Sequence, residues 1–324
     1  MSFKQTKESV DEGDVVILYF GPTNMHSIEV KRQIKNKKGE LVDNTFQTTY
    51  GALKVIDLVG KEYGSKVQLT KGFGYVLQPT PELWTSTLPH RTQIIYTADI
   101  SLIIHLLGLS PGSIVIESGT GSGSLSHALI RTIRPNGHLY TFDFHENRVN
   151  VARDEFQVHG LNEFVTVGLR DVCSEGFGDN LKHKADAVFL DLPHPWKTID
   201  FAVEALKESG GKLCSFSPCI EQVQRTCEKL ASTGFEDIKT YENLQTELQV
   251  HYKSIPILDL ESLKKPEEEE TNGEPIKKKG KFKIKQDENK ILTVSEPRQL
   301  PGHTGYITIA TLPPEFARSV IVES

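Results

Sequence analysis

The strongest chemical signal in the chain is a glycine-rich loop at residues 117–123, ESGTGSG. Three glycines at alternate positions allow backbone conformations, and a close approach of a ligand, that any side chain would prevent. A ligand can then lie against main-chain amides at the N-terminus of the helix that follows. A tight turn between a strand and a helix explains one of these glycines but not three. The loop therefore predicts a site for a nucleotide-type cofactor.

Acidic residues around this loop narrow the choice of cofactor. A dinucleotide fingerprint has the spacing GxGxxG, whereas this loop has ExGxGxG. Glu117 would repel a pyrophosphate, but it suits a cationic ligand such as S-adenosylmethionine. Asp143 ends the next predicted strand, where it can accept both ribose hydroxyls, and Asp171 follows the third, where it can meet the adenine amino group. Either aspartate alone fits an exposed loop equally well, but three acids at three consecutive strand ends favour this cofactor.

The segment after the fourth predicted strand, Asp191 to Trp196, is the candidate for contact with a second substrate. Active sites of open α/β sheets lie outside the carboxyl ends of the strands. Asp191 is therefore expected to contact a substrate amino group beside the methyl donor. Two prolines restrict the backbone, and the ring of His194 or Trp196 offers a face for stacking. The alternative interpretation is a proline-stiffened loop with a tryptophan on the surface.

Strands and helices alternate around these residues and must position them. Such repeats predict a parallel sheet that is covered by helices on both faces. The last strand, 305–314, returns after a long excursion and is expected to pair antiparallel with 235–241. The predicted strands before it are 113–117, 138–143, 164–168, 185–190, 212–216 and 235–241, and the predicted helices are 125–133, 147–160, 201–209 and 221–234.

The region before this sheet has a different pattern. Three β-branched segments separated by turn residues, 15–20, 26–34 and 65–70, predict a small all-β domain. A stretch rich in proline and threonine then leads to a helix at 99–109, whose apolar residues recur with a spacing near 3.6. The resulting division is an N-terminal β-domain at 1–78, a connecting segment and helix at 79–112, and a cofactor-binding α/β domain at 113–258 plus 299–324.

A charged insertion at 259–298 interrupts the α/β domain. Residues 264–290 contain four consecutive glutamates and a lysine-rich stretch, but almost no aromatic side chains and no apolar period. Such a composition leaves little to bury and predicts a disordered segment. The lysine-rich part, KKKGKFKIK at 277–285, is consistent with a nuclear import signal, an RNA-contacting arm or a solvated surface segment.

Composition excludes several classes of protein. The 324 residues include 37 basic and 43 acidic side chains, a net charge of −6, whereas a stand-alone nucleic-acid binder usually has the opposite sign. An RNA-acting chain would therefore need a concentrated basic patch or a basic partner. We expect neither a membrane nor a secreted protein, because no apolar run approaches the roughly 18 residues of a membrane helix and the N-terminus has no apolar signal segment. Four cysteines without zinc-like spacing indicate reduced thiols in an intracellular protein and no metal site.

Five motifs occur in order along the chain: 93–96 (QIIY), 117–123 (ESGTGSG), 142–148 (FDFHENR), 191–196 (DLPHPW) and 302–306 (GHTGY). Together they resemble the catalytic subunits of the eukaryotic tRNA (adenine-58-N1)-methyltransferases, over nearly the full chain except 264–290. The resemblance implies a seven-stranded Rossmann-like methyltransferase sheet with a small N-terminal all-β domain. It also implies a tRNA substrate, a location in the nucleus, and a homologous non-catalytic subunit that helps to grip tRNA. Two catalytic and two non-catalytic chains would form a heterotetramer.

The chemistry that the resemblance implies assigns a catalytic role to Asp191. Methyl transfer is an in-line displacement at carbon, so the protein mainly aligns donor and acceptor. Adenine N1 gains positive charge as the bond forms, and a carboxylate that accepts a hydrogen bond from the N6 amino group would stabilise that charge. A base in the folded T-loop must be turned out of its stack to reach such a pocket. Tyr96 and Trp196 are the candidates to receive it, and the alternative for either side chain is packing within the fold.

The resemblance assigns the other site residues by motif position. The expected cofactor-binding residues are Ile95, Glu117, Gly119, Gly121, Ser122, Gly123, Ser124, Asp143, Arg148, Asp171, Val172 and Asp191. The expected substrate-binding residues are Gln93, Tyr96, Pro193, Pro195, Trp196, His303 and Thr304.

Two alternative functions stay open at this point. The first is a non-catalytic RNA-binding homologue, and the intact glycine loop, Asp143 and Asp191 count against it. The second is a methyltransferase that acts on another substrate, and the N-terminal β-domain together with the GHTG motif at 302–305 counts against it.

Overall fold

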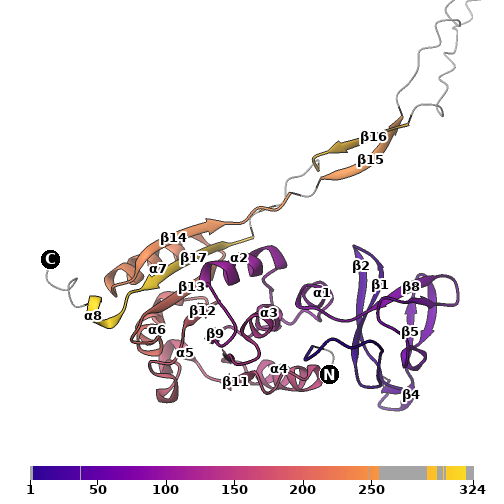
Figure 1. Ribbon diagram of the computed structural model, residues 1–324, viewed down its shortest axis with the longest axis horizontal. Helices are drawn as coiled ribbons and strands as arrows, with labels where there is room; N and C mark the ends of the chain where they lie inside the picture. Colours follow the sequence, from indigo (N-terminus) through magenta and orange to yellow (C-terminus); the bar gives the residue numbers. More distant parts are fainter. Residues whose placement is uncertain are drawn as a thin grey trace, which may run out of the picture. The chain divides into compact units, whose positions relative to one another are not determined.

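The computed structural model describes residues 3–36, 38–246, 248–254, 290–297, 302 and 304–318. Contacts divide the chain into two compact units, one of Met1–Asn243 with Thr304–Ser324 and the other of Leu244–His303. The first unit holds a seven-stranded sheet and an N-terminal β-region, and the second holds a β-hairpin (Figure 1). No helix in these described ranges is long and apolar enough to cross a membrane.

The seven-stranded sheet confirms the predicted fold class. Its order is β11-β10-β9-β12-β13-β17-β14, and the strands from β11 to β13 run parallel. The final strand pairs antiparallel with β14, as predicted, but it also pairs with β13 and therefore lies between them. The strands are β9 (Ile114–Ser118), β10 (His138–Asp143), β11 (Val165–Leu169), β12 (Ala187–Leu190), β13 (Gly211–Ser217), β14 (Glu236–Glu242) and β17 (Tyr306–Leu312).

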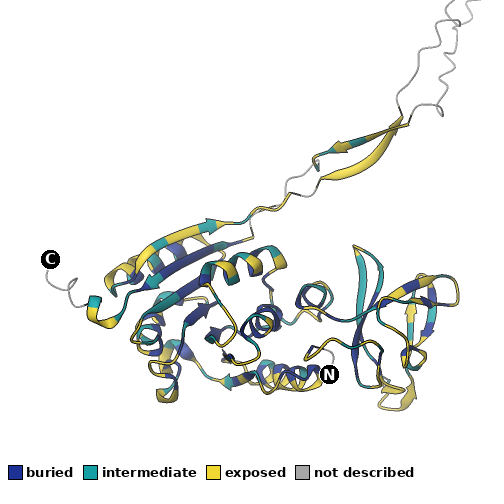
Figure 2. Ribbon diagram, in the orientation of Figure 1, coloured by how far each residue is buried: buried dark blue, intermediate teal, exposed yellow. Residues whose placement is uncertain are grey.

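Helices cover both faces of this sheet. Successive residues of a strand point to opposite faces, so each strand contributes side chains to two separate cores. In β9, Val115 packs in a core with α2, α3 and α4, while Ile116 packs in a second core with α5, α6 and α7. The central strands of the sheet are therefore largely buried, as the dark blue ribbon in Figure 2 shows. The helix predicted at 201–209 ends early, at Ala205, because Leu206 forms a bridge to Ala185 instead. The bounds are α2 (Thr97–Leu107), α3 (Ser124–Ile133), α4 (Glu146–His159), α5 (Val172–Glu175), α6 (Ile199–Ala205) and α7 (Ile220–Ser232).

The N-terminal region has its own apolar core, which includes Val16, Leu18 and Val76. Its main sheet has the order β2-β1-β8-β7, and two further strand pairs, β3 with β4 and β5 with β6, were not predicted. The strand predicted at 26–34 divides into two, because the chain turns between Glu29 and Lys31. The strands are β1 (Val15–Gly21), β2 (Asn24–Glu29), β3 (Gln33–Lys35), β4 (Leu41–Asp43), β5 (Thr45–Thr48), β6 (Gly51–Lys54), β7 (Lys66–Gln68) and β8 (Phe73–Leu77).

The second unit contains a hairpin that the sequence pattern did not predict. Strand β15 (Gln249–Ser254) pairs antiparallel with β16 (Lys290–Ser295) over six residues of each strand. The sequence-based division places 249–254 in the α/β domain and 290–295 in the disordered insertion, whereas the two segments pair with each other. Residues 255–289, which include most of the predicted disordered segment, lie outside the described residues.

Candidate active site

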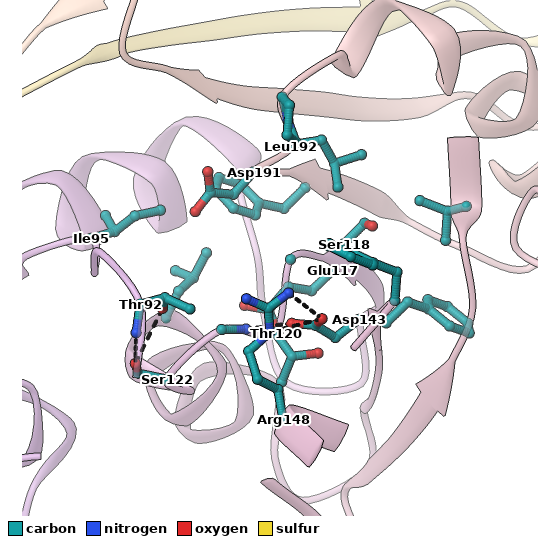
Figure 3. Close-up of a pocket in the computed structure, with 18 of the residues that line it drawn as sticks. Thr92, Ile95, Glu117, Ser118, Thr120, Ser122, Asp143, Arg148, Asp191 and Leu192 are labelled. Carbon is teal, nitrogen blue, oxygen red and sulfur yellow. Dashed lines mark hydrogen bonds and ion pairs between the residues drawn. The ribbon is translucent and has the colours of Figure 1, made fainter. Parts of the chain in front are cut away.

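A cavity of about 650 Å³ opens at the carboxyl ends of β9, β10 and β12. This volume lies within the range of roughly 300–1,000 Å³ that is typical of sites for small molecules and cofactors. Its lining includes the glycine loop, the residues after β10, β11 and β12, and residues 92–95 from the segment before α2. Figure 3 shows Asp191 and Ile95 on one side of the cavity and Asp143 with Arg148 on the opposite side.

The glycine loop requires glycine at two positions for different reasons. Gly119 has a φ of +101°, and a Cβ at this position would collide with the backbone oxygen of Asp191. Gly121 has a φ of +52°, and its Cβ would lie 2.8 Å from the side-chain oxygen of Thr92. Both substitutions would strain the backbone, since L-residues rarely adopt these conformations. The glycines therefore let the loop pack directly against two other walls of the cavity.

A pair of buried histidines supports the end of this loop. Nδ1 of His127 lies 2.6 Å from the carbonyl oxygen of Gly123, and Nε2 lies 2.8 Å from Nδ1 of His159. A carbonyl only accepts, so Nδ1 of His127 carries the proton, and Nδ1 of His159 then donates to Nε2 of His127. Burial lowers the pKa of His127 to about 4, and burial also lowers the pKa of His159. Both rings are therefore neutral at pH 7, and the hydrogen bond from His127 fixes the backbone of Gly123.

Glu117 supplies a buried carboxyl group at the base of the cavity. Only 1% of the residue is exposed, and the hydroxyl of Ser126 donates to its Oε2 over 2.6 Å. Burial raises the pKa of Glu117 to about 7, and the nearby charges of Asp191 and Asp143 act in the same direction. A positive charge in the cavity would therefore favour the ionised form of this group.

Asp143 is held in place by three neighbours. Its Oδ1 accepts hydrogen bonds from the backbone N–H of His145 and from Arg148, whose Nη2 lies 2.9 Å away. Its Oδ2 accepts the backbone N–H of Gly121 at 3.2 Å. A carboxylate oxygen has about two acceptor positions, so Oδ2 retains capacity for a ligand hydroxyl. Arg148 therefore lines the cavity as an ion-pair partner that orients Asp143.

Asp191 follows β12 directly and points its carboxylate into the cavity (Figure 3). Its backbone N–H donates to the carbonyl of Ser118 over 2.8 Å, which extends the pairing of β12 with β9. Burial raises the pKa of this carboxyl group to about 6. The group is thus mostly ionised at pH 7, and it can accept a hydrogen bond from an amino group.

Asp171 and Val172 also line the cavity, and the side chain of Asp171 has a structural role in addition. Its carboxylate caps α5, where Oδ1 accepts the N–H of Cys173 and Oδ2 accepts the hydroxyl of Ser174, both at 3.0 Å. Such a cap fixes the start of a helix. The side chain is exposed, so contact with a ligand amino group would use only its remaining acceptor positions.

Only some of the residues predicted to bind the substrate line the cavity. Gln93 and Pro193 line the cavity, whereas Tyr96, Pro195 and Trp196 are not part of its lining. Trp196 packs against the second core, with the guanidinium of Arg225 5.2 Å from its ring centre. Thr304 is exposed, and His303 lies outside the described residues.

Several residues of the cavity lining were not predicted from the sequence. Thr92, Phe144, Arg170, Cys173 and Lys197 all contribute to the wall. Each stands within a few positions of a predicted site residue, so proximity to a strand end was the available signal. Among them, Phe144 is the strongest candidate for contact with a ligand. It directly follows Asp143, and its exposed ring lies 5.1 Å from the guanidinium of Arg148.

The charges of the site favour a cationic ligand. Three carboxyl groups, from Glu117, Asp143 and Asp191, face one cavity, and Arg148 is already paired with Asp143. The other two cations of the lining are more accessible, since Arg170 is half-buried and Lys197 is exposed. A pyrophosphate at the loop would lie near Glu117, whereas a sulfonium or ammonium group there would be attracted to these acids.

Two solved structures of methyltransferases share this architecture. An S-adenosylmethionine-dependent O-methyltransferase from Thermotoga maritima aligns with a TM-score of 0.71 at 26% identity, over 96% of this chain and 97% of its own. The tRNA (m1A58) methyltransferase TrmI from Aquifex aeolicus aligns with a TM-score of 0.64 at 22% identity, over 94% and 98% of the two chains. The fold is therefore that of Rossmann-like S-adenosylmethionine-dependent methyltransferases.

Sequence relatives define the family. The tRNA (adenine(58)-N(1))-methyltransferase catalytic subunit of Dictyostelium discoideum is 43% identical over 93% of this chain and 96% of its own. That of Candida albicans is 44% identical over 75% and 70% of the two chains. Residues 72–312 match the family model described as tRNA methyltransferase complex GCD14 subunit. The chain belongs to this family of tRNA methyltransferase subunits.

Proposed function

We propose that this chain is the catalytic subunit of a tRNA (adenine-58-N1)-methyltransferase, which transfers a methyl group from S-adenosylmethionine to N1 of adenine 58. The two relatives described above, which carry this name, match most of the chain at 43% and 44% identity. The observation that carries the proposal is the cavity itself, where a glycine loop and three carboxyl groups converge at the edge of the sheet.

The residues of the cavity fit S-adenosylmethionine. This cofactor supplies an electrophilic methyl group on a sulfonium ion. Glu117 and Asp191 provide negative charge for its cationic groups, and the free acceptor position on Asp143 Oδ2 suits a ribose hydroxyl. The exposed ring of Phe144 is placed to contact a flat base after Asp143. Gly119, Gly121 and Gly123 line the cavity, so the backbone of the loop faces the ligand.

Asp191 is the proposed catalytic residue. In the proposed complex its carboxylate accepts a hydrogen bond from the N6 amino group of adenine, and it stabilises the positive charge that develops on the ring. Because its pKa is about 6, the carboxylate is available above that pH and is lost below it. Ile95 and Leu192 form an apolar part of the same wall and exclude water from the acceptor.

The base must leave its stack to reach this wall. Trp196 packs under Arg225, so Tyr96 is the better candidate to receive the flipped adenine. Tyr96 is 48% exposed and precedes α2, directly after Ile95 of the cavity wall. Gln93 and Pro193, which line the cavity, are the proposed polar and apolar contacts on the same side.

We further propose a homologous non-catalytic subunit as partner, in an assembly of two chains of each kind. The net charge of −6 is unfavourable for binding tRNA alone, and a basic partner would compensate for it. The hairpin offers a surface for such a partner. Val250 pairs with Val294 and Tyr252 with Leu292, so all four side chains lie on one face, and they are 56% to 70% exposed. An apolar face of this kind is unusual on a free surface.

A nuclear location is also proposed, from the lysine-rich sequence at 277–285. Clusters of this kind act as nuclear import signals in many proteins. Replacing five of these lysines with serine should move a fluorescent fusion of the full chain out of the nucleus. A fusion that stays nuclear after this change would argue that import depends on the partner or on another segment.

The test of the proposed activity is transfer of a labelled methyl group to an unmodified tRNA transcript by the full chain with its partner. A transcript with guanine at position 58 is the matched control. The proposal predicts label in the first transcript and background in the second. Equal label in both would contradict the assignment of position 58. In parallel, calorimetry should detect binding of S-adenosylhomocysteine and no binding of NAD.

A further inference from the structure

One wall of the cofactor cavity comes from outside the sheet. Residues 91–95, here called the strap, run between α1 (Pro81–Thr85) and α2. Its residues Thr92 to Ile95 line the cavity, and Ile94 and Ile95 are buried. The strap therefore closes the side that faces the glycine loop, and it includes both Ile95 and Gln93 of the proposed site.

The hydroxyl group of Ser122 is fully occupied in holding the strap. Its Oγ accepts the backbone N–H of Arg91 at 3.0 Å and that of Thr92 at 3.1 Å. A hydroxyl has two acceptor positions and one donor, so its own proton is directed to the Thr92 hydroxyl 3.2 Å away. Only 3% of Ser122 is exposed. No hydrogen-bonding capacity of this side chain remains for a cofactor.

Ser124 fastens the other end of the strap. Its hydroxyl donates to the carbonyl oxygen of Ile95 over 3.0 Å, and it accepts from the Thr85 hydroxyl over 2.8 Å. The residue is 4% exposed. The two serines expected to bind the cofactor thus direct their side chains away from it and toward the strap.

A third fastening lies outside the cavity. The guanidinium of Arg91 forms two parallel hydrogen bonds with the carboxylate of Glu155 in α4, at 2.8 and 2.9 Å. Bidentate pairs of this geometry are stronger and more directional than single contacts. Neither Arg91 nor Glu155 belongs to the cavity lining, so their pairing acts on the site indirectly, by tying the strap to α4.

We propose that Ser122, Ser124 and the Arg91–Glu155 pair are positioning residues, which hold the strap as a wall of the S-adenosylmethionine site. This inference rests on the proposed function for the identity of the cofactor. It assigns the two serines of the loop to the strap, whereas the resemblance had assigned them to the cofactor. A loosened strap should release bound cofactor product faster, because one wall of the site would open more often.

The test compares Ser122→Ala and Glu155→Gln with the wild type in the full chain with its partner. The matched control is Asp154→Asn, which removes the same charge from the neighbouring exposed position of α4. Dissociation of S-adenosylhomocysteine is measured by stopped-flow displacement, and hydrogen exchange is measured in peptides that cover residues 88–96. Thermal unfolding of each variant checks that the fold is intact.

We expect Ser122→Ala to raise the dissociation rate by on the order of tenfold, because it leaves two buried N–H groups without their acceptor. Glu155→Gln should raise it by about two- to fivefold, since a half-buried ion pair is weakened. Both should speed exchange in residues 88–96, and Asp154→Asn should change neither quantity.

Wild-type rates in Glu155→Gln, or faster dissociation in Ser122→Ala with unchanged exchange of residues 88–96, would overturn the inference. The second result would mean that Ser122 contacts the cofactor directly. If the wild type itself does not bind S-adenosylhomocysteine, the proposed function fails at the cofactor. A failure of the strap alone would leave that binding intact.

Discussion

The carboxyl edge of the seven-stranded sheet and the β15–β16 hairpin differ in whether their side chains find partners within the chain. At the sheet edge, Asp143 has hydrogen-bond or ion-pair partners within the same chain, and Glu117 accepts from Ser126. On the hairpin, Val250 and Tyr252 point their apolar side chains into solvent. Two strands alone are marginally stable in water, so this hairpin needs a surface to cover it.

In the proposed complex, this difference places the chemistry in the first unit and the contact with the partner in the second. The acids and the loop of the cofactor cavity lie in the first unit, and the exposed apolar face lies in the second. Changes at the sheet edge should therefore alter cofactor binding or rate without altering assembly. Changes on the hairpin should alter assembly while the cofactor cavity stays functional.

The largest effect is expected at Asp191. Asp191→Ala should lower the single-turnover rate of methyl transfer by on the order of 10²–10³, the usual cost of losing one positioned electrostatic group. Affinity for S-adenosylhomocysteine should also fall, by up to about tenfold, because the variant loses one of the carboxylates that face the amino group of this ligand, so the rate is measured at saturating S-adenosylmethionine. Rapid-quench kinetics and calorimetry measure the two quantities. A near-normal rate in the variant would remove Asp191 from the mechanism.

Glu117→Gln should weaken cofactor binding by about 10- to 100-fold, since it removes a buried charge next to a cation. The same change should stabilise the cofactor-free chain at high pH. The pKa of Glu117 is raised from 4.5 to about 7, so its contribution to stability is present below pH 4.5 and is lost as the pH rises to 7. Above pH 7 the variant should gain up to about 3 kcal/mol.

Chemical denaturation of both proteins at pH 5 and pH 8 checks the stability part of this prediction. The variant should gain more at pH 8 than at pH 5. An equal difference at both pH values would mean that Glu117 does not titrate between pH 5 and pH 8, and that burial does not raise its pKa into this range.

On the hairpin, Val250→Asp should weaken association with the partner by at least about tenfold, because it places a charge in an apolar contact. Binding of S-adenosylhomocysteine should stay at the wild-type level. Light scattering of co-expressed chains measures assembly. His251→Asp is the control, since this exposed residue lies on the opposite face of β15. If both variants assemble normally, the apolar face is not the partner surface.

The smallest effect is expected from the charged segment 264–290. Replacing residues 264–289 of this segment with a short Gly/Ser linker, which leaves Lys290 of β16 in place, should leave turnover on tRNA within a factor of about three, because closure entropy changes only logarithmically with loop length. If its lysines contact phosphates, each lost contact should reduce the slope of log affinity against log salt by roughly 0.7–0.9. Loss of cofactor binding would instead show that the segment supports the fold.

The sequence predicted those parts of the site that depend on topology. Parallel strands bring their carboxyl ends to one edge, so Glu117, Asp143 and Asp191 could be placed together from the strand pattern alone. The insertion of β17 between β13 and β14 could be predicted only in part, because an antiparallel strand can pair on either edge.

Contacts between segments that are distant in the sequence could not be predicted from the sequence pattern. The hydroxyl of Ser122 bonds to residues 30 and 31 positions earlier, and no local signal distinguishes that use from contact with a cofactor. Trp196 was placed correctly after β12, but packing against Arg225, rather than its position, decides where its ring lies. The strand β16 was missed because it adjoins a long charged run.

The most direct test of the central claim is the chemical identity and position of the methyl group in tRNA that the wild-type chain and its partner have treated with S-adenosylmethionine. Nucleoside and fragment mass spectrometry resolves N1-methyladenosine from N6-methyladenosine and locates each in the transcript. We expect N1-methyladenosine at position 58, and on the order of 100-fold less of it at the same early time when the chain carries Asp191→Ala. N6-methyladenosine, or a methyl group at another position, would contradict a mechanism in which Asp191 accepts from N6 while N1 reacts.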